Sequence, residues 1–196
     1  MNARRELAPT IESSAVLHDE IICLWEGLPA PTTRRGIVAA GFCLVTRQHV
    51  LAQFHLAAVG LDVSATTLVR PAFEALVRAV WVLKGADDKW IEGFTSPSDA
   101  AVNSDGETLK GPPIDSMLAT IKLHHPANVA DGLALLKEKT WRAMHSYVHG
   151  GFRAVAQAMT ESSEHEVAGM LMNANTMFGM ATNVFRMSCG VLTPEL

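Results

Sequence analysis

The chain has 196 residues, of which 48% are apolar and only 18% are charged. This length suits one sizeable domain and is short for two. The formal net charge of −4 argues against a broadly basic nucleic-acid-binding surface, but it leaves room for a small basic site. The scarcity of charged residues suggests that part of the surface is buried in an oligomer, and a homodimer is expected.

Helical spacing of apolar residues extends along almost the whole chain, and strand signals are nearly absent. Glycines, prolines and N-cap residues divide the pattern into predicted helices at residues 11–26, 32–59, 62–84, 87–94, 114–123, 128–149, 152–159 and 163–191. Pro71 lies inside the third of these, where it is expected to kink the helix or restart it. The pattern predicts one all-α domain over residues 1–196, an antiparallel bundle of about four to six helices.

Residues 95–113 contain almost no apolar side chain and are predicted to form the one long polar loop. No uncharged apolar run approaches the roughly 20 residues that span a bilayer, and no signal-peptide pattern follows the first methionine. Cys23, Cys43 and Cys189 are isolated in apolar sequence, which is typical of reduced, buried thiols. We therefore expect a cytoplasmic protein that does not enter the membrane.

The most informative segment is residues 141–151, Trp-Arg-Ala-Met-His-Ser-Tyr-Val-His-Gly-Gly. Residues three, four and seven apart share one face of a helix, so Arg142, His145 and His149 form a polar stripe. Such a stripe is costly to bury without partners, and histidine titrates near neutral pH. Ser146 and Tyr147 add polar groups beside it. This segment is the best candidate site.

The glycine pair at the end of this segment, Gly150 and Gly151, is expected to end or bend the helix. Close packing against another helix is the predicted reason for two adjacent glycines, because backbone approaches backbone most closely where a side chain is missing.

A second polar stripe lies on the predicted helix at residues 62–84. From Leu68 to Leu83 the side chains are apolar except for Arg70, Glu74 and Arg78, which are spaced four apart. Two interpretations stand side by side. The three residues form exposed ion pairs on a solvent edge, or they line a pocket, since a helix that is apolar nearly all round is buried.

If the two stripes face each other, Glu74 accepts a hydrogen bond from His145 or His149, and the arginines bind a phosphate. Histidine moves protons and arginine stabilises a charged transition state, which together suit metal-independent cleavage of RNA by its 2′-hydroxyl. This hypothesis gives two sets of site residues. The catalytic residues are Arg142, His149, His145 and Glu74, and the substrate-binding residues are Arg70, Arg78, Ser146 and Tyr147.

The spacing from Arg142 to His149 resembles the R-x(4–6)-H motif of HEPN domains, which are helical bundles common in bacterial toxin–antitoxin and phage-defence systems. The chain is also similar to bacterial helical families that pair an RPxxE helix, here residues 70–74, with a later histidine-rich segment, here residues 145–151. The resemblance covers about residue 38 to the C-terminus. It implies a homodimer in which Arg142 and His149 of two protomers cleave RNA, and an antitoxin as partner.

Two alternatives remain open. His145 and His149 have the i,i+4 spacing of metal ligands on one helix face, and Glu74 would be the third ligand from a facing helix. A non-enzymatic helical binding or interaction module with the same bundle is the other alternative, in which the histidines serve the structure. The leading hypothesis needs no metal and no cofactor.

Overall fold

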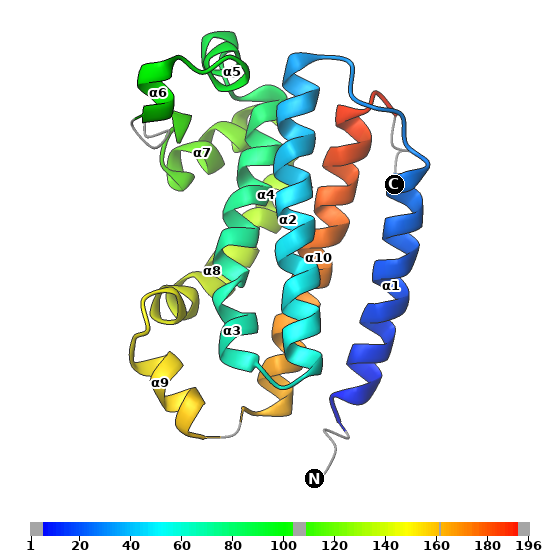
Figure 1. Ribbon diagram of the computed structural model, residues 1–196, viewed down its shortest axis with the longest axis vertical. Coiled ribbons are helices and arrows are strands. Elements are labelled where there is room, and N and C mark those ends of the chain that lie inside the picture. The colour runs from blue at the N-terminus through cyan, green and yellow to red at the C-terminus, as the bar shows by residue number, and fades with distance from the viewer. Residues whose placement is uncertain (1–5, 104–108, 161, 192–196) are drawn as a thin grey trace.

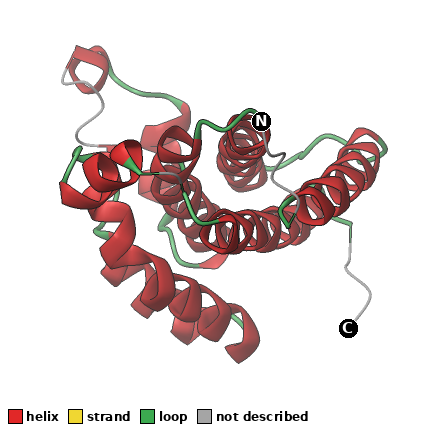
Figure 2. Cartoon of the chain, turned by 90° about the horizontal axis from the view of Figure 1, so that it is seen from below, coloured by secondary structure: helices red, strands yellow, loops and turns green. Residues whose placement is uncertain are grey.

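The computed structural model describes residues 6–103, 109–160 and 162–191, except for the side chains of Val102, Arg142 and Ala143. Every regular element in these ranges is a helix (Figures 1 and 2). The helices are α1 Ala8–Glu26, α2 Arg34–Ala58, α3 Asp62–Thr67, α4 Val69–Lys84, α5 Asp88–Thr95, α6 Asp99–Asn103, α7 Ile114–His124, α8 Ala127–Val148, α9 Phe152–Met159 and α10 Glu164–Ser188.

Four long helices form the core of the molecule. The central helix α2 packs against both α4 and α10, and α1 packs against the other side of α10 (Figure 1). Phe73 and Leu76 of α4 and Leu171 and Phe178 of α10 are completely or almost completely buried between these helices. Burial of large apolar side chains is the main favourable term in folding, so these contacts fix the position of α4.

The remaining helices lie around this core. Helices α7 and α8 pack against α4 and against each other, and α9 follows α8 and contacts α3. In Figure 1 this peripheral layer runs down the side of α4 that faces away from α1. The polar segment predicted to carry the site therefore lies at the edge of the core and not within it.

The predicted all-α single domain is confirmed, but the predicted number of helices is wrong. The described residues form ten helices, of which eight have at least seven residues, because the predicted helix at residues 62–84 is interrupted and the short helix α6 occurs in a predicted loop. The predicted helix at residues 62–84 breaks at Leu68, and Pro71 lies in the first turn of α4. Proline is tolerated in a first turn because its missing N–H group has no intrahelical partner there.

Two smaller expectations also need correction. The predicted polar loop at residues 95–113 contains the short helix α6, and Thr95 is the last residue of α5; residues 104–108 lie outside the described part of the chain. Cys43 is buried as expected, but Cys23 is exposed and Cys189 is partly buried. All three are free thiols.

Helix α2 is long and apolar enough to cross a membrane, by length and composition alone. The central helix of a bundle passes the same test, and α2 packs against α4 and α10. Its side chain Arg35 donates hydrogen bonds to the carbonyl oxygens of Val82 at 2.6 Å and Ala86 at 2.8 Å, which ties α2 to the end of α4. Its place in the bundle core accounts for part of its apolar composition, whereas Ile37, Leu44 and Val45 are exposed.

A buried polar network joins α1 to α10. His18 is only 3% exposed, and its Nε2 lies 2.9 Å from Oδ1 of Asn175, whose Nδ2 donates to the hydroxyl of Ser14 at 2.9 Å. The rings of Phe54 and Phe178 pack against the imidazole at centroid distances of 5.2 and 5.3 Å. Burial lowers the pKa of His18 below its usual value, an effect that the hydrogen bond from His18 Nε2 to Asn175 partly opposes.

This lowered pKa makes folding stability depend on pH. Below about pH 6.5 the unfolded chain binds a proton at His18, whereas the folded chain still holds the neutral imidazole. The free energy of unfolding therefore falls as the pH drops below about 6.5. We expect His18→Gln to reduce the loss of stability between about pH 7.5 and about pH 5, measured by urea unfolding. Some slope remains, because burial also lowers the pKa of His49 and His125.

The matched control is His165→Gln, which removes an exposed histidine from the start of α10. It should leave the pH dependence of the urea midpoint as in the wild type. An equal change of slope in both variants would contradict the role of burial at His18.

Candidate functional site

The polar residues of α4 form an ion-paired ladder along one side of that helix. Arg70 Nε lies 2.8 Å from Glu74 Oε1, and Arg78 Nη1 lies 3.6 Å from Glu74 Oε2. Arg78 also donates to the backbone oxygen of Glu74 at 3.3 Å. The three side chains are each about one-quarter exposed, at 24%, 25% and 23%. The sequence allowed either exposed ion pairs or a buried pocket lining, and the ladder is intermediate, since its side chains are neither fully solvated nor fully enclosed.

Arg70 connects this ladder to α8. Its Nη1 lies 3.1 Å from Nδ1 of His145, and its guanidinium carbon lies 4.7 Å from the centre of the Trp141 ring. Phe73 packs edge-on against the same ring, at a centroid distance of 6.2 Å. The two polar stripes of the sequence do meet, and the residue that joins them is Arg70.

The expected hydrogen bond from His145 or His149 to Glu74 does not occur among the described contacts. The described contacts pair the carboxylate with Arg70 and Arg78, and Arg70 in turn reaches His145. A carboxylate flanked by two guanidinium groups on its own helix has closer partners than an imidazole on another helix. Glu74 thus holds Arg70 in place and acts on His145 through it.

The two histidines lie together at the exposed end of α8. The ring centroids of His145 and His149 are 4.6 Å apart, both residues are exposed, and His149 is the C-cap residue of the helix. Arg142 belongs to α8, but its side chain lies outside the described residues. Of the predicted catalytic residues, the structure therefore brings together His145, His149 and, through Arg70, Glu74.

The glycine pair is explained by the end of this helix. Gly150 has φ +61°, and the N–H groups of Gly150 and Gly151 donate to the carbonyl oxygens of Tyr147 and Ser146, at 3.3 and 2.7 Å. This is the Schellman arrangement, in which a residue with positive φ satisfies the last carbonyls of a helix. Close packing does not explain Gly150, where an added Cβ would meet nothing within 4 Å. It does apply at Gly151, where an added Cβ would lie 2.8 Å from the Ser146 hydroxyl at the end of α8.

Ser146 and Tyr147 take part in the same corner. The hydroxyl of Ser146 accepts a hydrogen bond from the backbone N–H of Arg153 at 3.1 Å, and so satisfies a free donor at the start of α9. Burial, and then the carboxylate of Glu166, raise the pKa of the Tyr147 hydroxyl, while Arg153 lowers it. Ser146 thus has a partner at the start of α9, and the substrate-binding role of Ser146 and Tyr147 stays a prediction.

The metal-site alternative has no complete ligand set. No group of three or more His, Cys, Asp or Glu side chains that could hold a metal occurs among the described residues. Glu74, the expected third ligand, is paired with two arginines.

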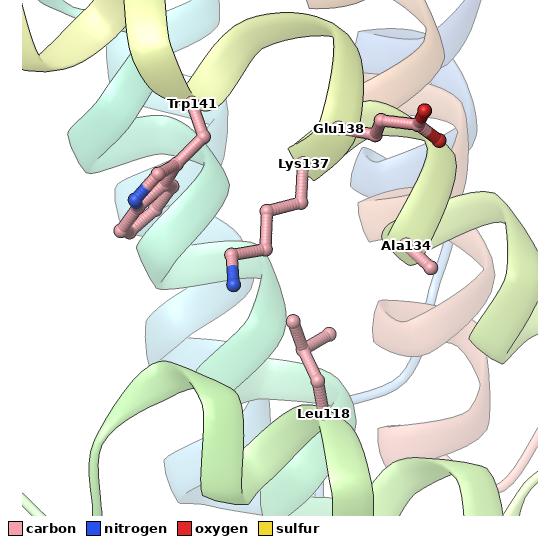
Figure 3. Close-up of a pocket in the computed structure, with 5 residues that line it drawn as sticks. All are labelled: Leu118, Ala134, Lys137, Glu138 and Trp141. Carbon is pink, nitrogen blue, oxygen red and sulfur yellow. The ribbon is translucent and has the colours of Figure 1, made fainter.

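A cleft lies next to the cluster, between α7 and α8 (Figure 3). Its volume is about 740 Å³, and it is lined by Leu118, Ala134, Lys137, Glu138 and Trp141. Trp141 separates the cleft from Arg70. The sequence interpretation did not assign a role to Lys137 or Trp141. Their spacing of four residues from each other and from His145 was the signal that places all three on one face of α8.

The fold and the cluster define an all-helical protein with an arginine, glutamate and histidine site where a core helix meets a peripheral helix. The chain matches the model of a family of unknown function (DUF6988) over residues 43–193, and it belongs to this family. The matched range includes α4, α8 and the whole cluster. This match carries no HEPN assignment. No curated protein and no solved structure matches the chain.

The positive φ of Gly150 at the end of α8 predicts that its change to alanine has the opposite effect from the same change at a glycine inside a helix. Gly150→Ala should lower the free energy of unfolding by about 1–2 kcal/mol, because an alanine is strained at positive φ. Gly179→Ala, inside α10 where an added Cβ meets nothing, should raise it by about 0.5–1 kcal/mol. Urea unfolding of both variants measures the difference. Equal effects would contradict the capping role of Gly150.

Proposed function

We propose that this protein is a HEPN-like bacterial endoribonuclease that works without a metal ion, as a cytoplasmic homodimer of toxin or phage-defence type. The observation that carries the proposal is the contact of Arg70 with His145, 3.1 Å from Nη1 to Nδ1. It joins a cation suited to phosphate with a side chain suited to proton transfer, at an exposed edge of the molecule.

The same contact sets the position of the proton on His145. A guanidinium group has only donors, so Nδ1 of His145 must accept the hydrogen bond from Arg70. The neutral ring then carries its proton on Nε2. To act as a general acid, His145 must also take up a proton at Nδ1, which ends the contact with Arg70 and frees that guanidinium for the phosphate.

His149 supplies a second proton-transfer group in the same place. Its ring centroid lies 4.6 Å from that of His145, and it is exposed at the end of α8. We assign it the role of general base. Arg142 is assigned to the developing negative charge on the phosphate, on the strength of the HEPN-like spacing alone, because its side chain lies outside the described residues.

In the proposed reaction, His149 accepts the proton of the RNA 2′-hydroxyl, whose oxygen attacks the adjacent phosphorus. The bond from phosphorus to the 5′-oxygen breaks, and His145, which enters this step as the imidazolium ion, gives its Nε2 proton to that oxygen and becomes neutral. The products are a 2′,3′-cyclic phosphate and a 5′-hydroxyl end, and no water or metal is consumed. Each proton transfer by a positioned side chain contributes about 10²–10⁴-fold to such a rate.

The homodimer follows from the HEPN resemblance and from the low charge content of 18%. In such a dimer the histidines and arginines of both protomers share one site. The resemblance also makes an antitoxin the expected partner protein. Size-exclusion chromatography with light scattering measures the oligomeric state directly.

The test is cleavage of single-stranded RNA by the untagged protein in the presence of EDTA. His149→Ala and Arg142→Ala should each lower the rate by about 10²–10⁴-fold and leave the fold intact by circular dichroism. His124→Ala removes an exposed histidine outside the cluster and should retain the wild-type rate.

Intact cleavage in both His149→Ala and Arg142→Ala would overturn the assignment. A wild-type protein that does not cleave RNA, yet retains a ligand or a partner on purification, would favour the non-enzymatic binding module instead. A cyclic phosphate on the cleaved product distinguishes the proposed reaction from hydrolysis by a contaminating metal-dependent nuclease.

A further inference from the structure

One face of α8 carries a stripe that extends beyond the two histidines. Lys137, Trp141 and His145 are spaced four residues apart on this helix, and each step of four residues advances about 6 Å along the axis. The first two side chains line the cleft, and the third belongs to the charged cluster. A cation, an aromatic ring and a proton-transfer group therefore follow one another along one line.

The cleft has the size and lining of a small-molecule subsite. Its volume of about 740 Å³ falls within the roughly 300–1,000 Å³ of ligand pockets, which accommodates a nucleobase with its sugar. Figure 3 shows the Trp141 indole on one side, Leu118 of α7 on the other, and the Lys137 side chain extending into the space between them. Glu138 also lines the cleft, but in Figure 3 its carboxylate points away from Lys137 and Trp141. The remaining aromatic ring, aliphatic side chain and cation are suited to a flat base with a phosphate attached.

Lys137 is held in this space by a partner that can be exchanged. Its ammonium nitrogen lies 5.2 Å from the centre of the Trp141 ring and pairs with the carboxylate of Asp115. The Lys137 side chain is only 23% exposed, whereas Asp115 is 78% exposed at the rim. Because Asp115 is solvated at the rim and regains contact with water when released, a phosphate group can take its place on Lys137.

We propose that the cleft binds an unpaired nucleobase of single-stranded RNA, with its base stacked on Trp141 and its phosphate on Lys137. This inference rests on the proposed function, since it places the base beside the phosphate that is cleaved at His145. Bases within a duplex are stacked on one another and are not free to enter the cleft. Base stacking on aromatic residues combined with basic side chains is the general mode of single-strand binding.

The test measures binding of a fluorescent 2′-O-methyl single-stranded oligonucleotide by anisotropy. This probe lacks the 2′-hydroxyl nucleophile, so binding is read independently of cleavage. Trp141→Ala and Lys137→Gln should each weaken binding by about tenfold. Asp115→Asn should strengthen it by about two- to fivefold, because it frees Lys137 from its competing carboxylate.

Lys139→Gln is the matched control, since it removes the same charge from the same helix at an exposed position outside the stripe. It should change the dissociation constant by less than about twofold. Trp141→Phe keeps an aromatic face and should retain most of the affinity, which separates stacking from a loss of fold. A duplex of the same sequence should bind more weakly than the single strand.

Equal losses in Lys137→Gln and Lys139→Gln, or no gain in Asp115→Asn, would overturn the subsite. Cleavage that proceeds normally in the Lys137 and Trp141 variants would also overturn it while the proposed function stands. The expected binding pattern without any cleavage of natural RNA would support the subsite and overturn the nuclease.

Discussion

The polar side of this molecule depends on the guanidinium group of Arg70. It lies 2.8 Å from Glu74, 3.1 Å from His145 and 4.7 Å from the ring centre of Trp141. A planar, delocalised cation with donors on several edges can pair with a carboxylate, donate to an imidazole and stack on an indole at the same time. The compact ammonium group of a lysine has no face to stack and fewer fixed directions. Only an arginine joins α4 to α8 in this way.

The two helices that meet at Arg70 contribute unequally. Helix α4 is a core helix, and its apolar side chains are buried against α2, α10 and α7, which fixes the base of the Arg70 side chain. Helix α8 is peripheral, and His145 and His149 are exposed. Glu74 compensates the charge of Arg70 at a place only one-quarter exposed, where an unpaired cation would be costly. The core helix α4 therefore positions Arg70, and Arg70 in turn orients His145 on the exposed helix α8.

The fold could be predicted to the level of helices but not to their number. Apolar periodicity identified the long helices within a few residues, and the Pro71 restart followed from the missing N–H group of proline. The break at Leu68 lies where Pro71 cannot donate to the carbonyl oxygen of Thr67, but the sequence left open whether the helix would kink there or restart. Periodicity reports which residues share a face, and local steric rules report where a chain must turn. Neither tells whether a helix continues or stops at a residue where both a continuous and a broken helix satisfy the apolar pattern.

The site shows the same division. Spacing placed Arg70, Glu74 and Arg78 on one face and the two histidines on another, and the structure brings these faces together. The sequence did not show which side chain would contact the histidines. A guanidinium and a carboxylate four residues apart pair on their own helix, so Glu74 binds Arg70 and it is Arg70 that contacts His145. The role of Ser146 was not readable either. Its hydroxyl caps α9 only because the glycine pair turns the chain back onto it, which is a property of three-dimensional structure.

The acidic balance of the chain restricts where an anionic polymer can bind. With a net charge of −4, the overall field does not attract RNA, so attraction must arise where cations are concentrated. Arg70, Arg78 and Lys137 concentrate positive charge on α4 and α8, but Glu74 and Asp115 already neutralise part of it. Few phosphates can then be neutralised, and counterion release provides correspondingly little affinity. In the proposed complex with RNA, stacking on Trp141 would then be the larger share of the interaction, and stacking selects unpaired bases over duplex. Weak electrostatics and a shaped aromatic cleft together favour selective binding over broad nucleic-acid affinity.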